Sequence, residues 1–537
     1  MRTVTALWIV GWGSAVGAKE IVVDFLDDVA PARVEAVARR LGLALAPASI
    51  DTERDRIYLA RVPDLHSLAA LEADPSIEAV EENSLYSIPD GEWGVLDATE
   101  VDRTRTFPND PRYREQWHLE QIHLPAAWKL GQGKGVVVAV IDTGVSRVSD
   151  LQATEFVSGW NFVDNSDHAE DDHGHGTHVA GTIAQSTNNG VGVAGVAYRA
   201  KIMPLKVLSA QGSGSVAGIA AAVRWAADHG AKVINMSLGG PLASRVLGSA
   251  VKYAHDHGVV VVCAAGNDGK GKVSYPAAYP SAIAVAATQK DEATTFYSNW
   301  GKQIDIAAPG GNVRSEPTGG VLQNTFFQGR DDYFFFMGTS MASPHIAGVA
   351  ALVMSAGVTD PDAVEKLLKT SARRPAGMKD EPGDYALHYG AGIVDAAAAL
   401  KRAKVGGGAL EIGAASAIAL AMAARLRRRM VRFGGLGAAV LVVGALFPAW
   451  DQSLLGVTGH GNLLFYSALL PMLALILFYG VPRARIGLAA LAWGVAGHLA
   501  AQLVWRTVDI QWMAWDSVWL AANALLASAI GYAAARK

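Results

Sequence analysis

Cysteine is almost absent from this chain: Cys263 is the single one among 537 residues. One cysteine cannot form an intramolecular disulfide, so the sequence excludes a disulfide framework. A strong charge imbalance is absent as well, because 46 lysine and arginine residues stand against 50 aspartate and glutamate residues, a formal net charge of -4. The basic surface that nucleic acids require is not indicated, and we predict no nucleic-acid partner.

Long apolar runs are rare before residue 405 and dominate after it, and the length allows about two to four domains. At the N-terminus, MRTVTALWIVGWGSAVGAKE combines Arg2 with a short apolar stretch and a tail of small residues. This pattern is typical of a secretory signal with cleavage near Ala18. The alternative is a first strand of the following domain. We predict a signal peptide at residues 1–18.

Residues 19–89 alternate between strand and helix patterns. The expected strands are IVVDFL, a short one near LALAP, DRIYLARV and IEAVEENSLYSI. The expected helices are PARVEAVARRLG and LHSLAALEADPS. This succession is that of a ferredoxin-like α+β domain. The polar residues 90–106 follow as an expected linker, which makes residues 19–89 a removable module.

Residues 107–404 alternate buried strands with helices. The apolar runs GVVVAVID, KIMPLKVL, AKVINMSLG, GVVVVCAAGN and AIAVAAT are separated by helical stretches such as VAGIAAAVRWAADHG. Strands rich in valine and isoleucine indicate a parallel sheet that helices cover on both faces, an α/β fold. In such sheets the chemistry gathers at the carboxyl ends of the strands.

Three polar side chains are expected at strand ends or helix starts. VVVAVIDTGV places Asp142 at the end of a buried strand, DDHGHGTHVAGT places His175 before an apolar helix, and FFFMGTSMASPH places Ser340 at the start of another helix. A serine is a poor nucleophile unless a base takes its proton, and the base needs an acceptor that holds its tautomer. The three residues supply these roles, although each alone could also be a structural cap.

A fourth polar side chain follows another strand. VVVVCAAGNDG places Asn267 where its amide could donate a hydrogen bond to a developing oxyanion. The GTSMA stretch is not the GxSxG elbow of the α/β-hydrolases, because Ala342 replaces the second glycine.

The histidine cluster allows a second interpretation. His173, His175 and His178 lie close in sequence to Asp171 and Asp172, and such residues can bind zinc. The HExxH spacing of the common metalloproteases is missing and no cysteine is near. We therefore favour the serine-based site over a zinc site.

The motifs VIDTGV, HGHGTHVAGTIA, SLGG, AAGNDG and GTSMASPHIAG resemble those of subtilisin-like serine proteases, in the same order. The stretch NDPRYREQWHLEQIHLPAAW is similar to the thermitase branch of that family, and the resemblance covers residues 109–400. It implies that Asp142 orients His175, which acts as general base and then acid, while Ser340 attacks the carbonyl. Asn267 and the backbone N–H of Ser340 would stabilise the oxyanion, with His178 as a structural neighbour.

The resemblance also implies a substrate cleft for polypeptides, of broad specificity that favours apolar or aromatic side chains before the cut. Two edge segments would hold the substrate backbone, and a third group would wall the specificity pocket. These residues are Gly212, Ser213 and Gly214; Ser237, Leu238 and Gly239; and Ala264, Ala265, Gly266 and Ser274.

A structural Ca²⁺ ion is a further implication of the resemblance, carried by the loop STNNGVGVAG. Hard cations such as Ca²⁺ prefer oxygen ligands. The alternative interpretation of this loop is a plain Asn-Gly turn without a metal ion. The implied ligands are Asp110, Asp150, Thr187, Asn189, Val191 and Val193. No catalytic cofactor is expected.

The N-terminal module gains a role from the same resemblance. Ferredoxin-like propeptides of this family act as folding chaperone and inhibitor and are removed by self-cleavage. Residues 19–89 resemble one, and the linker before Phe107 would hold the cut. The alternative is a permanent N-terminal domain.

Residues 405–537 begin with the glycine-rich VGGGALEIG and continue with apolar runs. These are ALEIGAASAIALAMAA, FGGLGAAVLVVGALFPAW, NLLFYSALLPMLALILFYGV, IGLAALAWGVAGHLAAQLVW and VWLAANALLASAIGYAAA. The second to fourth approach the length of a bilayer span, whereas Glu411 weakens the first. We predict an all-α transmembrane bundle of four or five helices.

Basic residues give an independent indication of orientation. RLRRRMVR, PRAR and the final Arg536 and Lys537 alternate with loops that are poor in basic residues. Such segments face the cytoplasm, so five crossings would place the protease domain on the extracytoplasmic side of the membrane. The prediction is a membrane-anchored serine endopeptidase made as a self-inhibited precursor. Its rivals are a membrane protein whose protease-like domain only binds peptides, and a zinc hydrolase.

Overall fold

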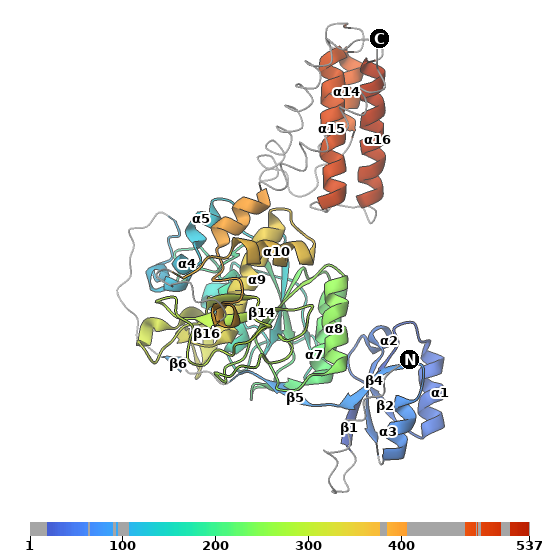
Figure 1. Cartoon of the computed structure of the whole chain (residues 1–537), viewed down its shortest axis with the longest axis vertical. Helices are drawn as coiled ribbons and strands as arrows, with labels where there is room; N and C mark the ends of the chain where they lie inside the picture. The colour runs from blue at the N-terminus through green and yellow to red at the C-terminus, as the bar shows by residue number, and fades with distance from the viewer. Residues whose placement is uncertain are drawn as a thin grey trace.

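The computed structural model describes residues 19–62, 65–89, 93–94, 107–375, 384–404, 468–478, 481, 485–505 and 516–535. Figure 1 shows a small N-terminal unit beside the large α/β domain, on the side where helices α7 and α8 lie. The predicted signal peptide, most of the linker and the first two apolar runs of the C-terminal part lie outside the described residues.

The N-terminal unit is a four-stranded antiparallel sheet in the order β2-β3-β1-β4. Its elements are β1 (Lys19–Phe25), α1 (Pro31–Leu41), β2 (Leu45–Pro47), α2 (Thr52–Asp55), β3 (Ile57–Val62), α3 (Leu65–Glu72) and β4 (Ile77–Glu82). The two faces of β1 have different partners: Val23 packs with residues of α1 and α3, and Val22 belongs to the core of the α/β domain. The succession of elements is the ferredoxin-like one expected from the sequence.

The large domain is built on parallel strands in the order β15-β14-β13-β12-β7-β10-β8. Their bounds are β7 (Val137–Asp142), β8 (Glu155–Phe156), β10 (Lys201–Lys206), β12 (Val233–Met236), β13 (Val260–Ala264), β14 (Ile283–Thr288) and β15 (Ile306–Pro309). The short β9 (Trp160–Asn161) also pairs with β10. These strands are buried almost throughout, which explains their continuous valine and isoleucine runs.

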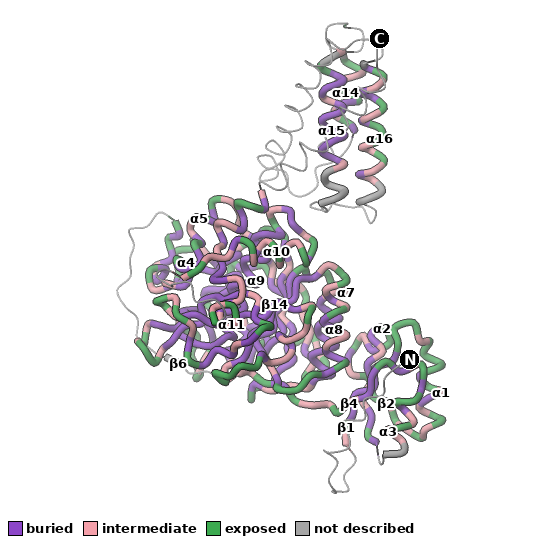
Figure 2. The backbone as a smooth tube through the Cα atoms, viewed as in Figure 1, coloured by how far each residue is buried: buried purple, intermediate pink, exposed green. Residues whose placement is uncertain are grey.

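Helices cover both faces of this sheet, as predicted. On one face α6 (His175–Ala184) and α9 (Thr339–Ser355) pack against Val138 and Val140 of β7. On the other face α7 (Val216–Asp228) and α8 (Arg245–Asp256) pack against Ala139 and Ile141. Side chains of a strand alternate between its faces, so a single strand serves two cores. Figure 2 shows the resulting buried centre.

Smaller elements complete the domain. The hairpin β16 (Val321–Phe327) and β17 (Arg330–Phe336) precedes α9, and β6 (Trp93–Gly94) joins it as a third strand. A two-stranded sheet pairs β5 (Leu85–Ser87) with β11 (Ser213–Ser215). Further helices are α4 (Trp117–Gln121), α5 (Leu124–Trp128), α10 (Pro361–Ser371) and α11 (Asp384–Tyr389), and residues 396–404 are helical as well.

The described C-terminal residues are helical. They form α14 (Leu469–Phe478), α15 (Arg485–Trp505) and α16 (Asp516–Ala535), which correspond to the last three apolar runs. Trp493 of α15 is buried against α16, where its indole N–H donates to the carbonyl of Ser528 at 3.2 Å. Over the residues that the structure describes, no helix is both long and apolar enough to cross a membrane.

Candidate active site

The carboxyl end of β7 and the starts of two helices bring the predicted catalytic side chains together. Asp142 is the last residue of β7, His175 the first of α6 and Ser340 the second of α9. The Nδ1–H of His175 donates to Oδ1 of Asp142 at 2.7 Å, and both side chains are buried. The bond fixes the tautomer, so that Nε2 of His175 is left as the proton acceptor.

The serine hydroxyl has a different partner. Oγ of Ser340 donates to the backbone carbonyl of Ser237 at 3.2 Å. Nε2 of His175 is buried and has no hydrogen-bond partner among the described residues. A reaction would therefore begin with rotation of the Ser340 hydroxyl towards the histidine, and such contacts often tighten only when substrate binds.

A second acidic residue supports the loop that presents His175. Asp171 is buried and accepts hydrogen bonds from the backbone N–H groups of Gly174 and Thr177, both at 2.8 Å. Thr143 joins the two segments, because its hydroxyl donates to Asp171 and its Oγ1 accepts from the N–H of Gly176. The sequence suggested Asp171 only as a possible zinc ligand; these contacts give it a structural part.

Asn267 is oriented by a residue that sequence reasoning missed. The hydroxyl of Thr339 donates to Oδ1 of Asn267 at 2.7 Å, and the Thr339 N–H donates to the same oxygen at 2.9 Å. Since the amide oxygen is engaged in this way, Nδ2 is the end that donates elsewhere. It donates to the carbonyl oxygen of Pro89, at 3.4 Å. The signal was the threonine directly before Ser340.

The two predicted edge segments enclose β5, the strand that follows the N-terminal unit. On one side β5 pairs antiparallel with β11, which contains Ser213 and Gly214, and the N–H of Ile88 donates to the carbonyl of Gly212 at 2.9 Å. On the other side Ser87 exchanges two hydrogen bonds with Gly239, at 2.8 and 3.0 Å. A peptide chain thus lies between both edges, with Pro89 at Asn267.

The neighbouring segment Ser237–Leu238 follows β12, and both residues are buried. The hydroxyl of Ser237 donates to the backbone carbonyl of Ser340 at 2.8 Å. This contact ties the edge segment to the start of α9, next to the serine hydroxyl.

The predicted pocket wall follows β13, which ends at Ala264. The backbone N–H of Ser274 donates to the carbonyl of Ala265 at 2.9 Å. Gly266 has φ +105, and a Cβ there would lie 2.5 Å from Oγ of Ser274 and 2.3 Å from Nδ2 of Asn299. The structure thus places Ser274 next to Gly266, and beside it Asn299, which no sequence motif indicated.

Of the other histidines in this cluster, His173 lies beside His175 with ring centroids 6.3 Å apart, whereas His178 packs against the β16–β17 hairpin. His178 is fully buried and stacks on Phe336 with ring centroids 4.2 Å apart, and its Nε2–H donates to the carbonyls of Val321 at 3.0 Å and Phe334 at 3.2 Å. Burial lowers its pKa to about 3. Across the described ranges no group of three or more His, Cys, Asp or Glu side chains is arranged to hold a metal ion. The geometry gives no support to a zinc centre.

The loop predicted to bind calcium surrounds two buried carboxylates. Asp110 accepts from the backbone N–H groups of Asn188 and Asn189, and Asp150 accepts from the Asn189 side chain at 2.8 Å and the Val193 N–H at 2.9 Å. Burial raises the pKa of Asp110 to about 6. Burial, with the nearby Asp110, raises that of Asp150 to about 7. Two desolvated carboxylates held together in this way favour a cation.

Two other predicted positions, Thr187 and Val191, belong to the same loop. The Thr187 hydroxyl donates to the carbonyl of Gln185 at 2.9 Å, and the Val191 N–H donates to Oδ1 of Asn189. Their backbone carbonyl groups would have to supply further oxygen ligands, because the predicted ligand set contains only two carboxylates, those of Asp110 and Asp150.

A parallel α/β sheet with an aspartate at the end of a strand, and a histidine and a serine at the starts of two helices, is the arrangement of a serine hydrolase of the Asp-His-Ser type. A family model, the subtilase family, matches residues 133–392. Thermitase from Thermoactinomyces vulgaris is 43% identical over 252 residues, which are 47% of this chain and 86% of that protein. The chain therefore belongs to the subtilase family, and it is a serine endopeptidase.

Two further comparisons extend this result. An extracellular protease from Xanthomonas campestris is 38% identical over 407 residues, 67% of this chain and 65% of the relative. The crystal structure of fervidolysin from Fervidobacterium pennivorans, described as a keratinolytic enzyme related to subtilisin, superposes with a TM-score of 0.58 at 26% identity. That match covers 72% of this chain and 61% of fervidolysin, more than the large domain alone.

Proposed function

We propose that the chain hydrolyses peptide bonds with Ser340 as nucleophile. As Oγ of Ser340 bonds to the substrate carbonyl carbon, its proton moves to Nε2 of His175, while Asp142 holds Nδ1–H. The proton then passes to the departing amine nitrogen as the C–N bond breaks, and water releases the acyl group by the same steps. The observation that carries the proposal is the buried Asp142–His175 hydrogen bond of 2.7 Å.

The oxyanion would be stabilised by the side chain of Asn267 and the backbone N–H of Ser340. Support comes from the aim of Nδ2 of Asn267, which donates to a peptide carbonyl, that of Pro89. In subtilisin, removal of the asparagine of the oxyanion hole lowers kcat by roughly a hundred- to a thousand-fold. We propose broad specificity for the residue before the cut, with a preference for apolar side chains, as the pocket walls suggest.

We further propose that residues 19–89 are an inhibitory propeptide and that the enzyme cuts its own chain between Pro89 and Asp90. The supporting contacts are main-chain pairing of Ser87 with Gly239, the Ile88 bond to Gly212, and the Pro89 carbonyl at Asn267. Pro89 would then be the residue before the scissile bond. A peptide held in this register blocks the cleft to other substrates.

Intact mass and N-terminal sequence test both proposals. We expect the wild type to give a chain that begins at Asp90, or further along the linker after trimming, and Ser340→Ala to keep residues 19–89 attached. If both chains stay uncut, the peptide-binding alternative is favoured. If both are cut, another protease matures the chain, and labelling of Ser340 by a fluorophosphonate then decides whether it is the nucleophile.

We propose that Asp110, Asp150 and the loop from Thr187 to Val193 bind one structural Ca²⁺. The buried carboxylate pair and its raised pKa values support a cation that neutralises it. Calcium should raise the Tm of the wild type relative to EDTA by several degrees, and Asp150→Asn should lose this rise. An equal Tm with calcium and with EDTA would contradict the site.

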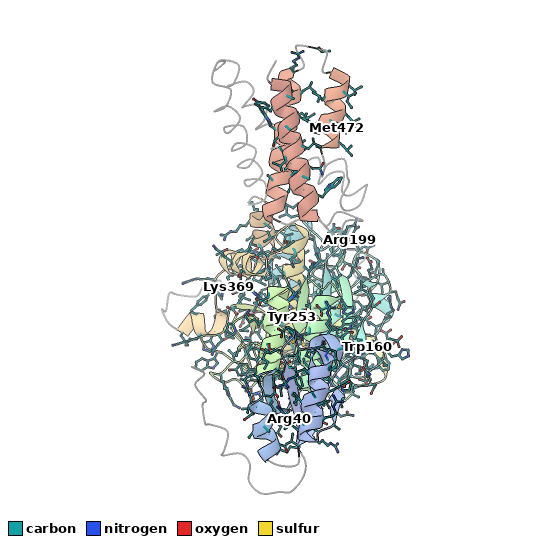
Figure 3. The ribbon with its side chains drawn as sticks, turned by 90° about the vertical axis from the view of Figure 1, so that its right-hand side faces the viewer. Arg40, Trp160, Arg199, Tyr253, Lys369 and Met472 are labelled. Atoms are coloured by element: carbon teal, nitrogen blue, oxygen red, sulfur yellow. The ribbon has the colours of Figure 1, made fainter. Side chains whose placement is uncertain are left out.

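We propose, finally, that residues 405–537 attach the protease to a lipid bilayer as a multi-pass segment, with the large domain on the extracytoplasmic side. Support comes from the apolar runs and from large apolar side chains that face outward: Ile476 and Leu477 are 71% exposed and Leu525 is 73% exposed. Figure 3 shows Met472 on the same helix as the first two. Carbonate-resistant membrane association that a chain ending at residue 404 lacks would support this; equal solubility of both chains would contradict it.

A further inference from the structure

The β16–β17 hairpin carries a third strand that comes from the other end of the chain. Residues 93–94 form β6 and pair antiparallel with β17, with Gly94 opposite Phe335 and Trp93 opposite Phe336. The order in this sheet is β16-β17-β6, so β6 occupies the edge of the hairpin that β16 leaves open. An extended segment has thus added to a sheet edge through its main chain.

The β17 edge, on which β6 pairs, lies close in sequence to the predicted nucleophile, Ser340. β17 ends at Phe336, four positions before Ser340 in the sequence. Pro89, whose carbonyl lies at Asn267, is separated from Trp93 by three residues. An extended chain covers at most about 14 Å over four such steps. The same peptide is therefore held before the proposed scissile bond by β11 and Gly239, and after it by β17.

The β17 edge is well anchored. Phe334, Phe335 and Phe336 are each 1% exposed. Phe335 packs with Val193 and Leu322, whereas Phe336 belongs to the main core. With its side chains fixed in two different cores, the strand holds its backbone N–H and C=O groups in place. Departure of the linker would leave these groups open to another extended chain.

We propose that the β17 edge at Phe335–Phe336 is a binding site for the substrate chain on the C-terminal side of the cleaved bond, reaching its fourth and fifth residues. The ligand is an extended polypeptide that binds through main-chain hydrogen bonds. Binding therefore depends little on the substrate sequence, and long substrates are favoured over short ones. The inference rests on the proposed cut between Pro89 and Asp90, which sets the count of residues.

Internally quenched peptides with the chain's own sequence test the site on the matured enzyme. One peptide spans residues 85–94, and a second ends two residues after the cut, at Gly91. We expect kcat/KM to be about tenfold higher for the longer peptide, because two main-chain hydrogen bonds are gained. Equal values would overturn the edge site while leaving the proposed function intact. If neither peptide is cut at Pro89–Asp90, the register fails and the edge site with it.

N-methylation of the peptide distinguishes binding through the main chain from binding through side chains. Successive residues of a strand point their N–H groups to opposite sides, so only one of Trp93 and Gly94 donates to β17. N-methylation at one of these two positions should abolish the gain and at the other should leave most of it. An Ala replacement of Trp93 that removes the gain, with both N-methyl peptides unaffected, would overturn main-chain recognition.

The full chain offers a matched pair of variants. Trp93→Pro and Gly94→Pro each remove one backbone N–H and are compatible with extended structure. One of the two should slow self-processing about tenfold and the other should leave its rate near that of the wild type. Unchanged rates for both variants would overturn the edge site, whereas an uncut wild type would overturn the proposed self-processing.

Discussion

The aim of Asn267 depends on its neighbour Thr339. Two hydrogen bonds from Thr339 occupy the amide oxygen of Asn267, and the Thr339 hydroxyl oxygen also accepts from the N–H of Gly266 at 3.1 Å. Without these bonds the amide could turn over and present its oxygen, an acceptor, to a developing oxyanion. Thr339 is in this sense a positioning residue.

We expect Thr339→Val to lower kcat about tenfold with little change in KM, because the lost contact matters most where charge develops. Thr339→Ser keeps the hydroxyl and should stay within about twofold of the wild type. Steady-state kinetics on one peptide substrate decide the matter. A valine variant with a raised KM and unchanged kcat would show a packing role instead.

At the scale of single residues, the sequence predicted the candidate catalytic side chains and missed the side chains that orient them. Asp142, His175, Ser340 and Asn267 follow from what a serine nucleophile requires, and the structure brings the first two into contact. The partners of Asn267 lie 72 residues away in sequence, and no local pattern encodes a contact of that range. Asn299 was missed for the same reason.

Helix α9, which contains Ser340, contributes to a buried pair of histidines. His345 lies within α9, and its Nε2 accepts from Nδ1–H of His118 at 2.8 Å, while its own Nδ1–H donates to the carbonyl of Met341. Burial lowers the pKa of His345 to about 4 and that of His118 well below its ordinary value. His178 of α6 behaves in the same way. All three side chains are therefore neutral in the folded protein.

Acid should destabilise this packing. Because the folded pKa values lie below the ordinary value near 6.5, stability is complete above about pH 6.5 and falls as the pH drops towards 4. The loss is about 2 kcal/mol at pH 5 for each of His345 and His178. Thermal unfolding from pH 7 to 4.5 measures it. His345→Gln should reduce the dependence of the unfolding temperature on pH, and the exposed control His257→Asn should not. A pH dependence unchanged by His345→Gln would contradict the conclusion that folding keeps His345 neutral.

Strands and helices of the large domain were predictable because their apolar runs are long and regular. The three phenylalanines before Ser340 are buried and form the end of β17. The pairing of that strand with β6 could not be predicted, since a two-residue strand more than two hundred positions away has no pattern of its own.

At the scale of the whole molecule, the N-terminal unit docks on α7 and α8 through a group of charges with excess acid. Arg224 of α7 contacts Asp27 and Asp55, and its guanidinium lies 4.1 Å from the ring of Tyr253. Further charged groups face the same region: Asp24, Asp51, Arg54, Glu78 and Glu81 from the N-terminal unit, and Asp228 from α7. Figure 3 views the molecule from the side on which α7 and α8 lie and labels Tyr253 of α8.

This contact should weaken as the pH rises. Burial raises the pKa of Asp24 to about 8 and that of Asp55 to about 7. Raised values mean that the docked state prefers both carboxyls protonated, so docking is strongest at low pH and is lost as the pH passes through 7 to 8. We expect the cleaved unit to be retained at least tenfold less tightly at pH 9 than at pH 6, by size-exclusion chromatography.

Asp24→Asn should remove much of this pH dependence, because an amide cannot ionise. The control is Glu35→Gln on α1, whose side chain is 70% exposed. An equal pH profile for wild type and Asp24→Asn would show that other groups govern docking. None of this was visible in the sequence, where Asp24 lies inside a strand pattern and Arg224 inside a helix pattern.

Because β5 is paired on both sides, the proposed cut after Pro89 and the release of the N-terminal fragment would be two separate events. Breaking the bond after Pro89 removes none of the hydrogen bonds that hold Ser87 and Ile88, nor the docking of β4 against α8. Under the proposed self-processing, a molecule that has cut itself once would still hold the fragment in its cleft, and its second turnover would wait for that fragment to leave. The onset of activity would then be set by the rate at which the fragment dissociates, which higher temperature and alkaline pH should increase, rather than by the chemistry of the first cut.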